Sequence, residues 1–72
     1  MDIVVRDYIT LGQLLKLAGE VNSGGEVKPY LASESPLVNG QPENRRGRKL
    51  RAGDTVILKH VGQINCVSEQ DS

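Results

Sequence analysis

The chain has 72 residues, nine Lys or Arg against nine Asp or Glu, and a formal net charge of zero. A chain this short buries only about 60% of its unfolded surface, so we expect one domain over residues 1–72, with its core at about 8–67 and no cleft between lobes. A single cysteine, Cys66, excludes an internal disulfide, and no run of about 18 apolar residues could cross a membrane. The start also lacks the basic flank and apolar stretch of a signal peptide, which together predicts a soluble cytoplasmic protein.

The first helix is predicted at residues 11–18, after a weakly alternating stretch at residues 1–9 that favours a short strand. Thr10 and Gln13 have the spacing of a capping box, in which two side chains satisfy free backbone amides at a helix start. Ile9 and Leu14 are placed to form a hydrophobic staple across that start. Helical spacing then gives one apolar stripe, made of Leu11, Leu14, Leu15 and Ala18.

A second capping box is formed by Ser23 and Glu26 and predicts another helix. Pro29 interrupts this pattern, because proline lacks an amide hydrogen and crowds the preceding turn. The helix therefore either starts late, near Gly25, or bends at Pro29. Its apolar side would be supplied by Val27, Tyr30 and Leu31.

After Ala32 the pattern changes from helical to extended. Asn39-Gly40 favours a tight turn, since both residues tolerate a positive φ angle. A further turn is predicted at residues 51–54, a buried strand at 55–58, and one more short strand around Ile64. Residues 68–72 are polar and we expect a frayed tail. Two helices followed by several short strands make an α+β domain.

The positive charges are concentrated in one segment, although the total charge cancels. Between Asn44 and His60 the only acid is Asp54, against six basic residues: Arg45, Arg46, Arg48, Lys49, Arg51 and Lys59. Such a local positive field attracts polyanions, and Arg also binds phosphate bidentately. The alternative is a solvated loop whose cations pair with Glu20, Glu26 or Glu34.

The order of elements and one stretch of sequence resemble the RNA-binding module named after ribosomal small-subunit protein four, here called the S-four domain and also known as the αL motif. The stretch carries Ser23, Glu26, Lys28 and then Val38-Asn39-Gly40 without a gap, and downstream Gly53-Asp54 and residues 56–58 match the family's closing turn and strand. The resemblance covers about residues 10–58 and is greatest to short stand-alone bacterial members, the YaaA-like and YbcJ-like proteins. One departure is Thr10-Leu11-Gly12, which stands where Arg-Leu-Asp is usual.

This resemblance implies two N-terminal helices packed on a small antiparallel sheet, and an RNA-facing surface formed by the second helix and a basic hairpin. The site would comprise Ser23, Gly24, Gly25, Lys28, Arg45, Arg46, Arg48, Lys49 and Arg51. Because base-stacking aromatics are nearly absent, we expect recognition of structured RNA by phosphate and shape contacts. The implied partner is ribosomal RNA first and transfer RNA second, with the ribosome or its assembly factors, for a monomer without cofactor or metal.

Three other functions compare with this one as follows. A protein-binding adaptor remains open from sequence. A ubiquitin-like sulfur carrier shares the length and the Asn-Gly turn but requires a terminal Gly-Gly, whereas this chain ends Glu69-Gln70-Asp71-Ser72. An enzyme is disfavoured, because His60 has no partner at metal spacing and Cys66 has no activating neighbour.

Overall fold

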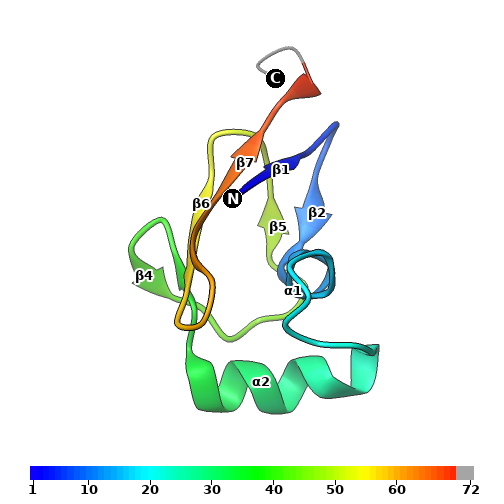
Figure 1. Ribbon diagram of the computed structural model, residues 1–72, viewed down its shortest axis with the longest axis vertical. Coiled ribbons are helices and arrows are strands. Elements are labelled where there is room, and N and C mark those ends of the chain that lie inside the picture. The colour runs from blue at the N-terminus through cyan, green and yellow to red at the C-terminus, as the bar shows by residue number, and fades with distance from the viewer. Residues whose placement is uncertain (70–72) are drawn as a thin grey trace.

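The computed structural model describes residues 1–69, which form two α-helices, a 3₁₀ turn and two β-sheets (Figure 1). In chain order the elements are β1 (Asp2–Val4), β2 (Ile9–Thr10), α1 (Leu11–Leu17), η1 (Gly24–Glu26), α2 (Val27–Glu34), β3 (Leu37–Val38), β4 (Gln41–Pro42), β5 (Lys49–Leu50), β6 (Thr55–Leu58) and β7 (Gly62–Val67). The predicted α+β fold class is confirmed. Neither helix of this part of the chain has the length and apolar character needed to span a bilayer.

The larger sheet has the strand order β1-β7-β6-β3-β4, while β2 and β5 form a separate two-stranded sheet. All pairings are antiparallel, as expected, except that β1 runs parallel to β7. The expectation of a fully antiparallel sheet is therefore wrong at this edge. The two strands come from opposite ends of the chain, so no hairpin turn fixes their relative direction.

Helix α1 begins as the capping box predicts. Thr10 Oγ1 accepts the Gln13 backbone N–H at 3.2 Å, and Gln13 Oε1 accepts the Thr10 N–H at 2.8 Å. The helix ends at Leu17, one residue before the predicted end, and Ala18 is its C-cap. Of the predicted apolar stripe, Ala18 is partly buried and the three leucines have no exposed surface: Leu11, Leu14 and Leu15.

The second helix starts late, which resolves the two alternatives raised by Pro29. Residues Gly24–Glu26 form the 3₁₀ turn η1, and α2 follows at Val27, so Pro29 lies in the first turn of the α-helix. A proline is tolerated there because the first amides of a helix are not needed within its ladder. The Glu26 carboxylate accepts the backbone N–H groups of Asn22 and Ser23, as the predicted cap requires.

The predicted turns and late strands are also present. Asn39 and Gly40 have φ angles of 52° and 83° and form the tight turn between β3 and β4. The strand predicted at residues 55–58 is β6, and β7 follows it as a hairpin partner. Of the tail predicted to fray, Glu69 forms an ion pair with Arg6 at 3.1 Å, and residues 70–72 lie outside the described residues.

The hydrophobic core joins both helices to both sheets, and its side chains are aliphatic apart from one thiol. Each member is at most 6% exposed. Because the core draws on both helices and on β3, β5, β6 and β7, it fixes where the loops between them lie. Its members are Val5, Leu11, Leu14, Leu15, Val21, Val27, Leu31, Val38, Leu50, Val56, Leu58, Ile64 and Cys66.

Candidate nucleic-acid interface

The arginine cluster lies on a loop between the two sheets rather than on a hairpin. The β3–β4 hairpin ends at Pro42, and residues 43–48, here called the basic loop, cross from β4 to α1 before β5 begins (Figure 1). The predicted basic hairpin is therefore wrong. The turn at Asn39 closes the hairpin before the first arginine, and pairing of β5 with β2 then draws the chain to the other sheet.

The backbone of the basic loop is held by the first turn of α1. The Leu11 N–H donates to the Arg48 carbonyl at 2.9 Å, and the Gly12 N–H donates to the Arg46 carbonyl at 3.0 Å. Since Thr10 caps the next amide, the first three N–H groups of α1 all have partners. The start of α1 therefore serves to position the arginines.

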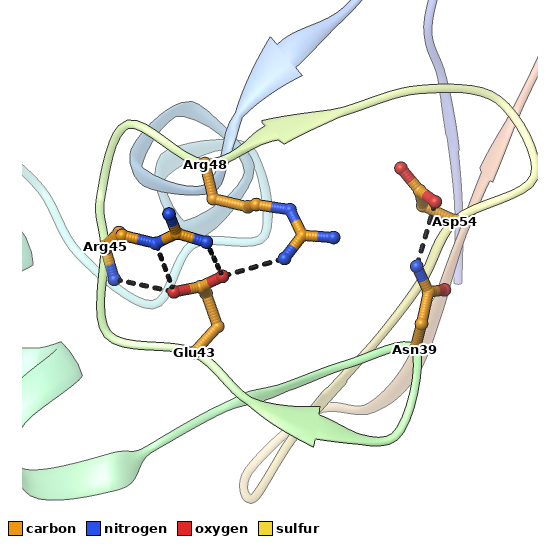
Figure 2. Close-up of polar contacts among 5 residues, drawn as sticks. All are labelled: Asn39, Glu43, Arg45, Arg48 and Asp54. Carbon is orange, nitrogen blue, oxygen red and sulfur yellow. Dashed lines mark hydrogen bonds and ion pairs between the residues drawn. The ribbon is translucent and has the colours of Figure 1, made fainter.

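Glu43 organises two of the arginine side chains, and Figure 2 shows its carboxylate facing both guanidinium groups. Its Oε2 accepts the backbone N–H and the Nε–H of Arg45 at 3.2 and 3.0 Å, while Oε1 accepts from Arg45 Nη2 at 3.1 Å and from Arg48 Nη1 at 2.8 Å. Glu43 is only 8% exposed, whereas the side chain of Arg45 is 72% exposed and that of Arg48 34% exposed. One buried acid thus fixes two cations that still face solvent.

Hydrogen bonds from Arg45 lower the pKa of Glu43 to about 2, against an ordinary value of 4.5. Burial opposes this shift, and the bond from Arg48 adds to it. The carboxylate is therefore charged at any physiological pH and keeps both guanidinium groups oriented. Glu43 lies one residue outside the segment that the charge pattern singled out, which is why sequence reasoning missed it.

Three shallow depressions surround the basic loop and collect cations from several elements. One of about 430 Å³ is lined by Arg45, Gly47, Arg48, Lys49 and Arg51. A second of about 320 Å³ lies between α2 and the loop and is lined by Lys28, Leu31, Asn44 and Arg46. The third, of about 280 Å³, brings Lys16 and Gly24 beside Arg46. We call the cations of these depressions the basic surface: Lys16, Lys28, Arg45, Arg46, Arg48, Lys49 and Arg51.

Lys16 is a member of this surface that the sequence did not reveal. A methyl group placed on Gly24 would lie 3.9 Å from Lys16 Nζ, so the lysine stands against the start of η1. Seen in sequence, Lys16 is an ordinary polar residue on the exposed side of a helix, and only the packing of α1 beside η1 brings it to the basic surface. No local sequence pattern indicates that Lys16 lies beside Gly24.

The predicted residues at the start of the second helix lie on the same side of the molecule. Lys28 and Gly24 line two of the depressions, together with Arg46. The Ser23 N–H, however, already donates to Glu26, the chain's own anion. Phosphate binding by Ser23 and Gly25 stays a prediction.

Comparison with known proteins places this arrangement in a family. The sequence model of the S4 domain matches residues 3–65. The chain belongs to the S4 domain family. A curated relative, "Probable ribosome maturation protein RlbA" from Bacillus subtilis (strain 168), is 48% identical over 62 residues, which cover 86% of this chain and 87% of the relative. No solved structure gives a significant match.

Membership of the S4 domain family confirms the resemblance drawn from residues 10–58. It also disfavours the interpretation as a sulfur carrier, because the Asn-Gly turn that such carriers share is present in this S4 domain as well. That turn has a role here beyond reversing the chain. Asn39 Oδ1 accepts the Thr55 N–H at 2.9 Å. Asn39 Nδ2 donates to Asp54 at 3.0 Å, as Figure 2 shows. The hairpin is thereby tied to the turn that follows β5.

Asp54 is a second acid whose charge acts on arginines of the basic surface of this S4 domain. Burial alone would raise the pKa of Asp54, but bonds from the Arg51 N–H and the Asn39 amide lower it, helped by the charges of Arg48 and Arg51. The net shift is downward, so Asp54 is ionised and attracts both arginines. Glu43 thus binds two arginine side chains directly, whereas Asp54 accepts the Arg51 backbone N–H and interacts with the arginine side chains through charge alone.

Neither Cys66 nor His60 lines the three depressions. Burial raises the pKa of the Cys66 thiol, and the nearby Asp54 charge adds to that. The His60 side chain is 69% exposed and its Nε2 lies 3.0 Å from Glu34. Residues 1–69 contain no group of three or more His, Cys, Asp and Glu side chains arranged to hold a metal ion.

Proposed function

We propose that this S4 domain binds structured RNA, ribosomal RNA first and transfer RNA second, through phosphate and shape contacts made by the basic surface. The single observation that carries the proposal is the concentration of charge. Seven of the nine Lys and Arg residues of a chain with zero net charge line three adjoining depressions. Phosphate contacts from Lys and Arg supply most of the affinity of proteins for nucleic acids.

The organisation of the surface supports this function. An arginine loop that only solvated the protein would need no fixed conformation, yet here two guanidinium groups are oriented by a buried carboxylate and the backbone is bound to α1. Oriented guanidinium groups lose less conformational entropy when they bind phosphate bidentately. The relative's name, a ribosome maturation protein, supports a ribosomal RNA partner.

We further propose a non-catalytic, cytoplasmic role for a monomer that acts on the ribosome or with its assembly factors. No metal or cofactor is required by the contacts described. The basic surface would bind the RNA backbone, whose phosphates would lie along the depressions between α1, α2 and β5.

The test compares two double variants that each lose two positive charges. Lys28→Ala/Arg46→Ala removes cations from the basic surface, and neither side chain forms an ion pair with another described residue. Arg6→Ala/Lys59→Ala removes cations outside it. Each protein is titrated into a ribosomal RNA helix fragment at several salt concentrations, after circular dichroism has shown that it is folded.

We expect the affinity of the wild type to fall steeply with salt. The first variant should bind at least about tenfold more weakly, with the slope of log K against log salt reduced by about 1–2, since about one counterion is released per phosphate contact. The control variant should lose less than about threefold. Equal losses in both variants would contradict the proposed surface, and weak binding by all three proteins would instead direct the search to a protein partner.

A further inference from the structure

Tyr8 is an exposed aromatic residue at the edge of the basic surface. It precedes β2 and is 42% exposed, although it is one of only two aromatic residues in the chain. Lys49 Nζ lies 4.9 Å from the centroid of its ring, and Arg51 Cζ lies 5.9 Å from it. Both distances are within the range of cation–π interactions.

The pairing of β2 with β5 places these three side chains together. Ile9 pairs with Leu50, which is fully buried, so the residues on either side of Leu50 point to the other face of the strand. Lys49 and Arg51 are those residues, and both line the depression of about 430 Å³ that also contains Arg45 and Arg48. The ring therefore stands beside the largest concentration of positive charge in the described residues.

The other tyrosine of the chain, Tyr30, has a structural role. Tyr30 packs against the core, and its hydroxyl donates to Glu20 at 3.0 Å. Burial, assisted by the bond to Glu20, raises the pKa of Tyr30 to about 12. Tyr8 is not part of the core cluster, so its large apolar ring lies at a position where core packing does not require it.

We propose that Tyr8 stacks on an unpaired nucleobase of the bound RNA, while Lys49 and Arg51 hold the adjoining phosphates. The proposal rests on the proposed RNA-binding function and deepens it. A ring beside a cationic depression matches the arrangement by which proteins bind single-stranded nucleotides, where aromatic stacking and backbone charge act together. The RNA recognised would therefore be a helix with a bulged or looped-out nucleotide, not a fully paired duplex.

Two RNA hairpins with the same stem test this, one with a three-nucleotide bulge and one without, each closed by a non-nucleotide linker so that neither has unpaired loop bases. Binding of wild type, Tyr8→Ala and Tyr8→Phe is measured by fluorescence anisotropy of labelled RNA. Ile57→Ala serves as the matched control, because Ile57 is also 42% exposed but lies on β6, in the depression that contains Leu37 and Lys59. Tyrosine fluorescence in a Tyr30→Phe background then reports on Tyr8 alone, as the chain has no tryptophan.

Stacking predicts that Tyr8→Ala weakens binding to the bulged hairpin at least about 5-fold and changes binding to the paired hairpin less than 2-fold. Tyr8→Phe and Ile57→Ala should behave as wild type, the salt slope should not change, and Tyr8 fluorescence should be quenched by the bulged hairpin only. Equal losses on both hairpins, or no loss on either, would overturn the stacking role while leaving the proposed function intact. If the wild type bound neither hairpin, both proposals would fail.

Discussion

At the scale of single residues, the site depends on an acid rather than on its arginines alone. Glu43 accepts four hydrogen bonds from two arginines while being only 8% exposed. A buried carboxylate is stable in a protein only when it is paired in this way. The ionised form of Glu43 therefore stabilises both the fold and the conformation of the basic loop.

This pairing predicts a dependence of stability on pH. The folded-state pKa of Glu43, about 2, lies below its ordinary value of 4.5, so its contribution is fully present above pH 4.5 and is lost as pH falls towards 2. We expect that contribution to be roughly 1–3 kcal/mol of the free energy of unfolding. Urea unfolding of wild type and Glu43→Gln at pH 7, 4, 3 and 2.5 measures it.

The two unfolding curves should converge as the pH falls: Glu43→Gln should be less stable than wild type at pH 7, still clearly less stable at pH 4, and progressively closer to wild type at pH 3 and 2.5. Asp7→Asn, which replaces an exposed carboxylate by its amide, is the matched control and should follow the wild type throughout. A constant difference between wild type and Glu43→Gln at every pH would show that the ionised carboxylate is not the cause.

At the scale of elements, the start of α1 and the basic loop form one unit. Two amides of the helix donate to carbonyls of the loop, and a capping box satisfies the next. A methyl group at position 12 would lie 3.5 Å from the Arg46 carbonyl oxygen and 3.5 Å from a Val27 methyl, which is ordinary contact, so alanine would fit there. A branched side chain would extend beyond that.

Substitution of Gly12 therefore separates the loop's position from its charge. Gly12→Ala should leave stability within about 1 kcal/mol of wild type, since alanine favours a helix and fits. Gly12→Val should lower the free energy of unfolding by about 1–3 kcal/mol and weaken RNA binding several-fold without removing any cation. Urea unfolding and RNA titration of both variants measure these effects. Tighter or unchanged RNA binding by Gly12→Val would contradict the claim that the start of α1 positions the basic loop.

Local elements were predictable from the sequence because their signals are local. The capping box at Thr10, the turn at Asn39 and the strand at 55–58 each depend on residues within a few positions of one another. Three features were not predictable: the parallel pairing of β1 with β7, the pairing of β5 with β2, and the contacts of Glu43. The first two join segments distant in sequence, and β2 and β5 are too short to show any period.

The same limit applies to the site. The arginines could be named because they are adjacent in sequence, whereas Lys16 and Tyr8 reach the basic surface only through packing and strand pairing. The prediction that the arginines lie on a hairpin failed because the turn at Asn39 closes only the short hairpin of β3 and β4. Nothing nearby in sequence indicates that β5 pairs with β2 instead of extending that hairpin.

At the scale of the whole molecule, the net charge of zero gives no indication that a polyanion would be attracted, whereas the distribution of the charges does. Seven of the nine cations line three adjoining depressions, where Glu43 forms ion pairs with two of them, Arg45 and Arg48. A polyanion would therefore be attracted to these depressions, and its affinity would be strongly dependent on salt.

The most direct test of the account is to map RNA binding on the ¹⁵N-labelled protein by NMR during titration with a ribosomal RNA helix fragment. The account predicts that amides in residues 44–51 and 23–28 shift most, with smaller changes at 10–13, while those of β7 and of Ile57 stay in place. Shifts gathered on β7 or around Ile57, with none in the basic loop, would contradict the claim that the basic surface binds RNA.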